Sequence, residues 1–360
     1  IYPQANTIDI KSMATDGDSV DFGDLSSNKW GIGTASDTTR AVFCGGSDPG
    51  HSDDIEFVTI STAGNVTDFG NLTAASADAS VASNSKRAVI QGQQTPSNLN
   101  QLDVITIQSA GNAANFADLA VLRHQCFGGS NGGGGIPQEG SFAQRPSATY
   151  MPGSGRAVML GGENPSGLTG TIDLVFISTL GNASDFGNLS VTRNNSGSSG
   201  SITRAITAGG NAPGYSDVID SIELASQGNA ADFGNLQAGR RTLGVTASTT
   251  RIVYGGGSTS APTVVDTIGY NTIATAGNAA DFGNLTTTRR TVGTGNITRG
   301  LFMGAFPSAN TIDYITIANT GNATDFGDLL AANQFGAALS SATRAIHGGG
   351  QAPGLVNVMQ

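Results

Sequence analysis

The chain has 360 residues and a formal net charge of −10; 52 residues are glycine and only 12% are charged. This acidic balance argues against a nucleic-acid-binding protein, which usually carries a basic face. Abundant glycine and small polar residues favour short strands and tight turns over helices. Without an apolar run of about 18 residues, the sequence predicts no transmembrane span.

One sequence motif recurs along the whole chain. It reads Ala-Asp-Phe-Gly-Asn-Leu over residues 280–285. Its phenylalanine returns at Phe22, Phe69, Phe116, Phe186, Phe233, Phe282 and Phe326, with spacings of 47, 47, 70, 47, 49 and 44 residues. A period of this length is the signature of a repeat architecture, and we therefore predict seven copies of one structural unit.

Each unit predicts four short strands. In the last complete unit these are residues 291–295, residues 299–304 ending in a glycine turn, the alternating β-branched residues 310–317, and residues 325–329. Gly321 and Asn322 predict a tight hairpin between the last two strands, because both residue types tolerate positive φ.

A glycine doublet closes the second strand in most units, as at Gly45-Gly46, Gly209-Gly210 and Gly348-Gly349. With a β-rich third strand, an aromatic residue in the fourth and an Arg shortly after, this pattern resembles the kelch repeat over nearly the whole chain. Kelch blades usually carry Trp where this chain has Phe. The resemblance implies an all-β fold: a single seven-bladed β-propeller over residues 1–360, with four antiparallel strands per blade.

The two chain ends are expected to complete one blade. The chain opens with a third strand and closes with a first and a second, so pairing residues 6–25 with residues 334–350 closes the ring and removes open edges. Residues 351–360 are expected to leave the disc as a connector to a further domain.

One unit carries an insertion. The distance from Phe116 to Arg156 is 40 residues instead of 17 or 18, which places a 22-residue insertion within about residues 124–150. The inner strand of this blade is either residues 125–127 or residues 149–151.

Charged residues recur at fixed positions in the unit. An arginine opens the second strand, and an aspartate precedes the phenylalanine of the fourth strand at the same end of the blade. We predict a structural Arg–Asp link that pins each blade or adjacent blades, with the phenylalanine filling the gap between blades. The arginines are Arg40, Arg87, Arg156, Arg204, Arg251, Arg299 and Arg344, and the aspartates include Asp68, Asp185, Asp232, Asp281 and Asp325.

A second acidic set opens the third strand, and arginines after the fourth strand oppose it. Two interpretations stand side by side: local neutralisation by the carboxylates, or an Arg-lined face that binds acidic sugars through bidentate contacts. The acids are Asp9, Glu56, Asp103, Asp173, Asp220, Asp266 and Asp313, and the arginines are Arg123, Arg193, Arg240, Arg241, Arg289 and Arg290.

The loops between the second and third strands vary while the frame stays constant, which is how a recognition surface is built; permissive turns are the alternative. The candidate recognition residues are His51, Pro96, Asn164, Tyr215, Pro262, Phe306, Arg193, Arg240 and Arg289.

Catalytic and metal sites find no support in the residue pattern. The three histidines fall in different units, and no carboxylate pair has a spacing typical of such a site. We therefore expect a protein that is not an enzyme, with no catalytic residue, metal or cofactor.

The amino-acid sequence of the repeats, as in residues 312–329, resembles that of virion structural and tail-fibre-associated proteins of marine bacteriophages, particularly those that infect cyanobacteria. The resemblance implies a virion or extracellular protein within a larger assembly. It would act as an adhesion module, and its partners would be other virion proteins and host-surface glycans. The alternatives are an extracellular carbohydrate-active enzyme of propeller type and a kelch-type protein-interaction scaffold.

Overall fold

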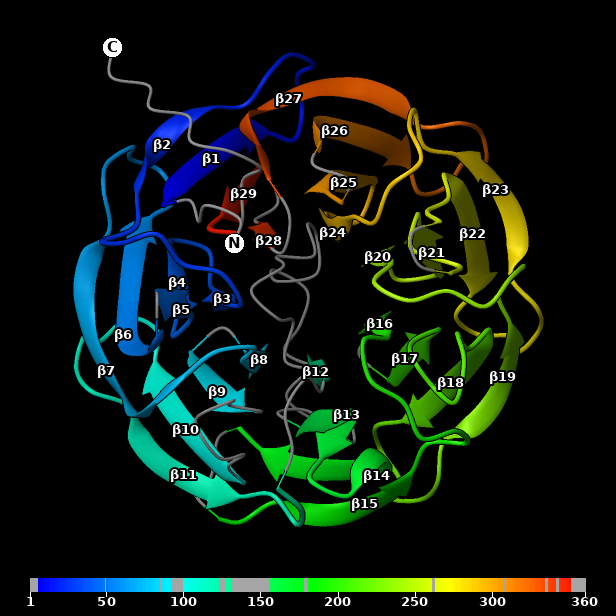
Figure 1. Cartoon of the computed structure of the whole chain (residues 1–360), viewed down its shortest axis with the longest axis horizontal. Coiled ribbons are helices and arrows are strands. Elements are labelled where there is room, and N and C mark those ends of the chain that lie inside the picture. The colour runs from blue at the N-terminus through cyan, green and yellow to red at the C-terminus, as the bar shows by residue number, and fades with distance from the viewer. Residues whose placement is uncertain are drawn as a thin grey trace, which may run out of the picture.

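The computed structural model confirms the seven-bladed β-propeller, with seven antiparallel sheets arranged around a central axis (Figure 1). The structure describes residues 6–48, 50–84, 86–91, 100–122, 127–130, 156–177, 181–201, 203–260, 263–306, 309–333, 336–340 and 343–350, and none of these residues is helical. The arrangement is compatible with a kelch-like repeat protein.

Each blade has four strands that follow one another from the axis to the rim, and we number the blades in chain order from the blade that holds β1. Blade 1 consists of β28 (Ala337–Ser340), β29 (Arg344–Gly348), β1 (Thr7–Ser12) and β2 (Val20–Asp24). Blade 2 consists of β3 (Gly33–Ser36), β4 (Arg40–Cys44), β6 (Gly50–Thr59) and β7 (Thr67–Ser76), with the short β5 (Ser47–Asp48) paired to β6. Blade 3 consists of β8 (Ser80–Ser83), β9 (Arg87–Gln91), β10 (Gln101–Thr106) and β11 (Ala114–Asp118).

The remaining blades repeat this order. Blade 4 consists of β12 (Phe127–Ser130), β13 (Arg156–Asn164), β14 (Gly167–Phe176) and β15 (Ser184–Asn188). Blade 5 consists of β16 (Gly197–Gly200), β17 (Arg204–Ala208), β18 (Val218–Glu223) and β19 (Ala231–Asn235). Blade 6 consists of β20 (Gly244–Ala247), β21 (Arg251–Gly255), β22 (Thr267–Thr272) and β23 (Ala280–Asn284). Blade 7 consists of β24 (Val292–Gly295), β25 (Arg299–Ala305), β26 (Ala309–Thr316) and β27 (Thr324–Asn333).

The ring closes as the sequence predicts. Strand β1 pairs with β29, so that Ile8 lies opposite Gly348 and Ser12 opposite Arg344. The chain ends thus share one sheet, and blade 1 is built from both (Figure 1). The expected connector, residues 351–360, lies outside the described residues.

The structure also answers the question left open at the insertion. The inner strand of blade 4 is β12, which overlaps the first of the two predicted positions and pairs Phe127 with Leu160 of β13. Residues 123–126 and 131–155, which include the rest of the insertion, lie outside the described residues.

The phenylalanine of each fourth strand lies at a boundary between two blades. Phe282, 3% exposed, packs in one cluster with Val253 and Ile268 of blade 6 and with Phe302 and Ile315 of blade 7. A cluster of this kind occurs at each of the seven boundaries and contains the equivalent phenylalanine. Much of the apolar core therefore lies between blades.

The glycine and asparagine of the repeated motif join neighbouring blades as well. Gly283 has a φ of +144°, and a Cβ there would lie 2.4 Å from the carbonyl oxygen of Gly321 in the hairpin of the next blade. The amide of Gly321 donates to the carbonyl of Phe282 (2.7 Å), and the Asn322 side chain accepts from the amide of Asn284 (3.1 Å). Equivalent side-chain acceptors occur around the ring at Asn65, Asn112, Asn182, Asn229, Asn278 and Asp18. Close approach of the two backbones explains why glycine follows the phenylalanine.

Candidate functional site

The arginines that open the second strands also bridge adjacent blades, but the acceptor differs from the predicted one. The guanidinium of Arg251 donates to the backbone carbonyls of Ile317 (3.1 Å) and Ala318 (2.6 Å), just after the third strand of blade 7. The other six arginines each donate to a carbonyl after the third strand of the next blade, at Ile107, Ile177, Leu224, Ile273, Met13 and Ile60.

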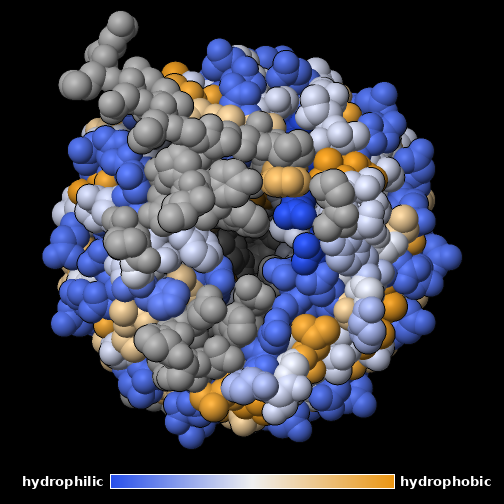
Figure 2. Space-filling view, viewed as in Figure 1, coloured by the Kyte–Doolittle hydropathy of each residue, from blue (hydrophilic) through white to orange (hydrophobic). Residues whose placement is uncertain are grey.

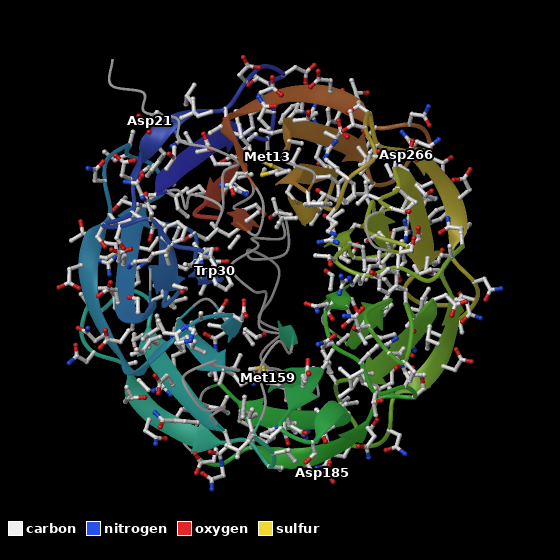
Figure 3. The ribbon with its side chains drawn as sticks, viewed as in Figure 1. Met13, Asp21, Trp30, Met159, Asp185 and Asp266 are labelled. Carbon is white, nitrogen blue, oxygen red and sulfur yellow. The ribbon has the colours of Figure 1, made fainter. Side chains whose placement is uncertain are left out.

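These carbonyls replace the aspartates that the sequence predicted as partners, which corrects the Arg–Asp link. The aspartates of the fourth strands are exposed, and Asp21 and Asp185 lie at the outer rim of the disc (Figure 3). Asp68, Asp232 and Asp325 each accept a hydrogen bond from the amide of the glycine two residues later, at 2.9 Å. A rim aspartate therefore stabilises its own strand, while the carbonyl at a strand end is the nearer acceptor for the arginine.

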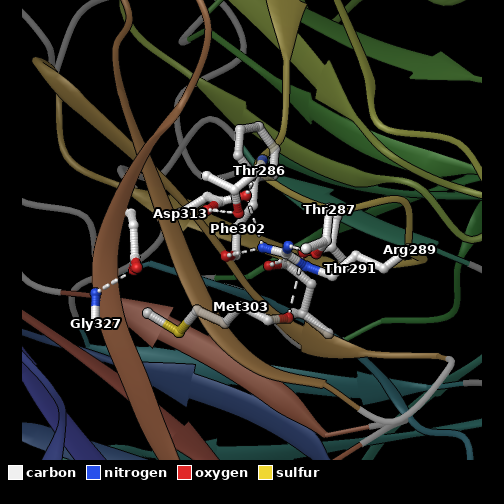
Figure 4. A network of polar contacts seen from close by, with 10 residues as sticks. Thr286, Thr287, Arg289, Thr291, Phe302, Met303, Asp313 and Gly327 are labelled. Atoms are coloured by element: carbon white, nitrogen blue, oxygen red, sulfur yellow. Dashed lines mark hydrogen bonds and ion pairs between the residues drawn. The ribbon is translucent and has the colours of Figure 1, made fainter.

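A second buried cation, Arg289, lies four residues after the leucine of the motif and inserts into the next blade. Arg289, 0% exposed, makes an ion pair of 3.0 Å with Asp313 and donates to the carbonyl of Phe302 and the hydroxyl of Thr287 (Figure 4). Arg193 and Asp220 form the same pair at 2.7 Å. In both cases burial lowers the pKa of the guanidinium and the carboxylate opposes the shift. These contacts support the neutralisation alternative for Arg193 and Arg289.

Arg240 occupies the same place without a carboxylate partner among the described residues. It is 2% exposed and donates to the carbonyls of Gly256 (3.0 Å) and Thr267 (2.7 Å). Burial lowers its pKa to about 10. Close by, the buried Tyr254 hydroxyl has no hydrogen-bond partner in the described structure.

The lack of a described carboxylate partner for Arg240 corrects the prediction that Asp266 is the equivalent acid in blade 6. The β-bulges that precede Asp220 and Asp313 in their third strands precede Gly269 in blade 6. Gly269, and not the predicted Asp266, is thus the structural equivalent of these acids. The side-chain amide of Gln237 lies in the space where a Cβ of residue 269 would point.

Burial also corrects the candidate recognition set. Arg193, Arg240 and Arg289 are 1%, 2% and 0% exposed, so these three side chains do not form an exposed binding face. They are part of the polar layer between blades.

The residues that follow two of these arginines do reach the surface. The guanidinium of Arg241 lies 5.0 Å from the centre of the Tyr215 ring, and that of Arg290 lies 4.7 Å from the centre of the Phe306 ring. Tyr215 and Phe306 belong to the variable loops between second and third strands, so two predicted recognition residues lie in this group. We call these four residues the arginine–aromatic cluster.

The two arginines of the cluster are close enough to influence each other. Burial lowers the pKa of Arg290, and the positive charge of Arg241 lowers it further. Both side chains are partly exposed, and the Nε atom of each is buried without a hydrogen-bond partner in the described structure. Neither arginine forms an ion pair with any described carboxylate.

Equivalent positions in other blades are not cationic where the structure describes them. They hold Trp30, Ala77 and Asn194. Blades 5 to 7 therefore carry a sector that departs from the repeat. In Figure 2 the centre of the visible face is hollowed, and residues at the most hydrophilic end of the scale border the hollow on the side of β20 and β24.

The remaining candidate recognition residues lie elsewhere. His51 lies on β6 of blade 2, and Asn164 ends β13 of blade 4, where its side chain accepts from the amide of Ser166 (2.8 Å). Pro96 and Pro262 lie outside the described residues.

Other site types leave little trace in the described part of the chain. It contains no group of three or more His, Cys, Asp or Glu residues that could hold a metal ion. It also contains no helix long and apolar enough to cross a membrane. Searches found no protein-family model and no curated protein that matches this chain.

Proposed function

We propose that this protein is a non-enzymatic binding module of a bacteriophage virion, carried by a tail fibre or decorating the particle. It attaches to a host-surface glycan or to a neighbouring virion subunit through the face that carries the loops between second and third strands. A propeller fold suits a binding or scaffold module in general. The virion assignment rests on the resemblance of the repeat sequence to virion proteins of marine bacteriophages.

The observation that carries the binding role is the contrast between a repeated frame and one sector that departs from it. The Arg–carbonyl bridges and the inter-blade phenylalanines recur around the ring. The arginine–aromatic cluster does not recur at the equivalent described positions, and two of its members come from the variable loops. Constant scaffolds with variable loops are typical of recognition surfaces.

Immunogold labelling tests the virion assignment. Antibodies against the isolated disc should label purified particles from a culture whose phage encodes the chain, and mass spectrometry should find its peptides in those particles. Soluble disc should also reduce adsorption of the particles to host cells if the disc contacts the host. Particles that lack the chain would refute the virion role.

Incubation with host-surface polysaccharide separates binding from turnover. Retention of the polysaccharide without release of shorter products agrees with the proposal. Release of oligosaccharides would instead favour a carbohydrate-active enzyme of propeller type.

A further inference from the structure

We infer that the arginine–aromatic cluster binds a carboxylate-bearing sugar unit of an acidic polysaccharide. The inference deepens the proposed function by naming a ligand class and its residues. It depends on the loop face being a binding surface and does not depend on the chain being part of a virion.

The first argument is electrostatic. Arg193 and Arg289, two buried cations that each face an acid, are neutralised within 3.0 Å. Arg241 instead lies close enough to Arg290 for its charge to lower the pKa of Arg290. Like charges held together in a partly desolvated place raise the free energy of the unliganded protein. An anion between them removes this cost, so the cluster is complementary to a negative group.

The second argument concerns the geometry of the guanidinium groups. Each lies near an aromatic ring, at 5.0 Å for Arg241 and 4.7 Å for Arg290, which restricts its orientation. A contact of this kind uses the flat face of a guanidinium, and because each Nε is buried, the edge left for a ligand is the pair of terminal nitrogens. That edge matches the two oxygens of a carboxylate in a bidentate contact.

The third argument selects a sugar acid over a phosphate. Asp217, two residues after Tyr215, is exposed, and Asp266 at the start of the third strand of blade 6 is partly exposed on the same face. Such carboxylates accept hydrogen bonds from sugar hydroxyls. They repel a doubly charged phosphate more strongly than the single charge of a sugar carboxylate. The rings of Tyr215 and Phe306 add apolar surface for the C–H faces of a pyranose.

Binding to three polymers tests the inference, with polygalacturonate as the carboxylated probe, a sulfated galactan as a second anion and dextran as the neutral one. The wild-type chain should bind polygalacturonate, more weakly as NaCl rises, and dextran not at all. Arg241→Gln and Arg290→Gln should each weaken binding about tenfold or more, because each removes one bidentate contact. Lys86→Gln is the matched control, since it removes one exposed positive charge elsewhere on the disc and should leave binding unchanged.

Melting temperatures equal to that of the wild type establish that the variants fold. Arg290→Lys, which keeps the charge but lacks the fork, should give an intermediate loss and provides a second variant should Arg290→Gln not fold. Wild-type affinity in both Gln variants, or equal binding of dextran, would overturn the site. Equal binding of the sulfated galactan would overturn the assignment to carboxylates. Absence of the chain from particles would refute the virion role and leave these results standing.

Discussion

The boundaries between blades 6 and 7 and between blades 5 and 6 have the same architecture but different polar contents. At the first, buried Arg289 faces Asp313 at 3.0 Å. At the second, equally buried Arg240 faces Gly269, and backbone carbonyls accept its hydrogen bonds. The boundary between blades 7 and 1 shows the converse, since buried Asp9 is present and Asn333 stands at the place of the cation.

The comparison teaches that the ring does not need a complete ion pair at every boundary. Asp9 accepts hydrogen bonds from the Ser19 hydroxyl and the Leu330 amide, and burial raises its pKa to about 6. Arg240 relies on carbonyls and its pKa falls to about 10. Apolar clusters hold together the boundary between blades 5 and 6 and the boundary between blades 7 and 1. The buried charged group at each boundary forms its hydrogen bonds with the donors or acceptors that lie nearby.

Breaking the complete pair should have the largest effect. Asp313→Ala leaves Arg289 buried without a carboxylate, and the free energy of unfolding should fall by roughly 3–5 kcal/mol. Urea unfolding measures the loss. The double variant Arg289→Met, Asp313→Leu should recover most of it, because no charge then remains buried. A loss below about 1 kcal/mol in Asp313→Ala would contradict the role of the pair.

Asp9→Asn tests the boundary that has an acid without a cation. Because the folded-state pKa of Asp9, about 6, exceeds the ordinary value near 3.9, the protonated acid favours folding below pH 4 and this contribution is lost as pH rises through 6. The amide oxygen of Asn accepts the same two hydrogen bonds without a charge. At pH 7 the variant should therefore be more stable, by at most about 3 kcal/mol.

Thermal unfolding at pH values from 4 to 7 measures this effect. The stability difference between Asp9→Asn and the wild type should grow with pH and level off above pH 6. A difference that does not change with pH would contradict the assignment. His347 adds a second pH dependence to both proteins, because burial lowers its pKa to about 4 and its contribution to stability is lost as pH falls toward 4.

Gly269→Asp supplies the acid that Arg240 lacks and should make the two boundaries alike. The free energy of unfolding should rise by about 1.5–3 kcal/mol, as expected for a hydrogen bond to a charged group. Gln237 must move, since its side chain lies 2.6 Å from the Cβ position. Gly269→Ala is the control, and its melting temperature separates the effect of the carboxylate from that of the added Cβ. Equal stability of the two variants would show that no ion pair forms.

The smallest effect is expected for an element that both boundaries share. Arg251→Ala removes the hydrogen bonds to the carbonyls of Ile317 and Ala318, and Arg204→Ala removes the bond to Ile273 together with an ion pair to Glu223. Each should lower the free energy of unfolding by about 1 kcal/mol, because the arginines are partly solvated. Differential scanning calorimetry of both variants measures the loss, and an unchanged melting temperature would contradict a structural role.

The sequence by itself determined the ring. Seven phenylalanines at a nearly constant period, glycine doublets and Gly-Asn hairpins are local signals, and they predicted the strands, the blade count and the closure of residues 6–25 with the C-terminal strands. Such signals succeed because the strand pattern and tight turns depend on neighbouring residues. The phenylalanines also predicted where apolar side chains would gather, since a bulky residue repeated once per blade needs a repeated gap.

Only the tertiary structure decided which polar groups meet across blades. Arg251 binds the carbonyl of Ile317 rather than an aspartate because the end of a strand in the next blade leaves that acceptor nearby. Gly269 rather than Asp266 faces Arg240 because a bulge sets the register. Arg241 and Arg290, separated by a whole unit in sequence, influence each other only because the blades curve around one axis. Contacts between residues of different blades depend on how the blades pack, and the strand pattern of the sequence does not predict them.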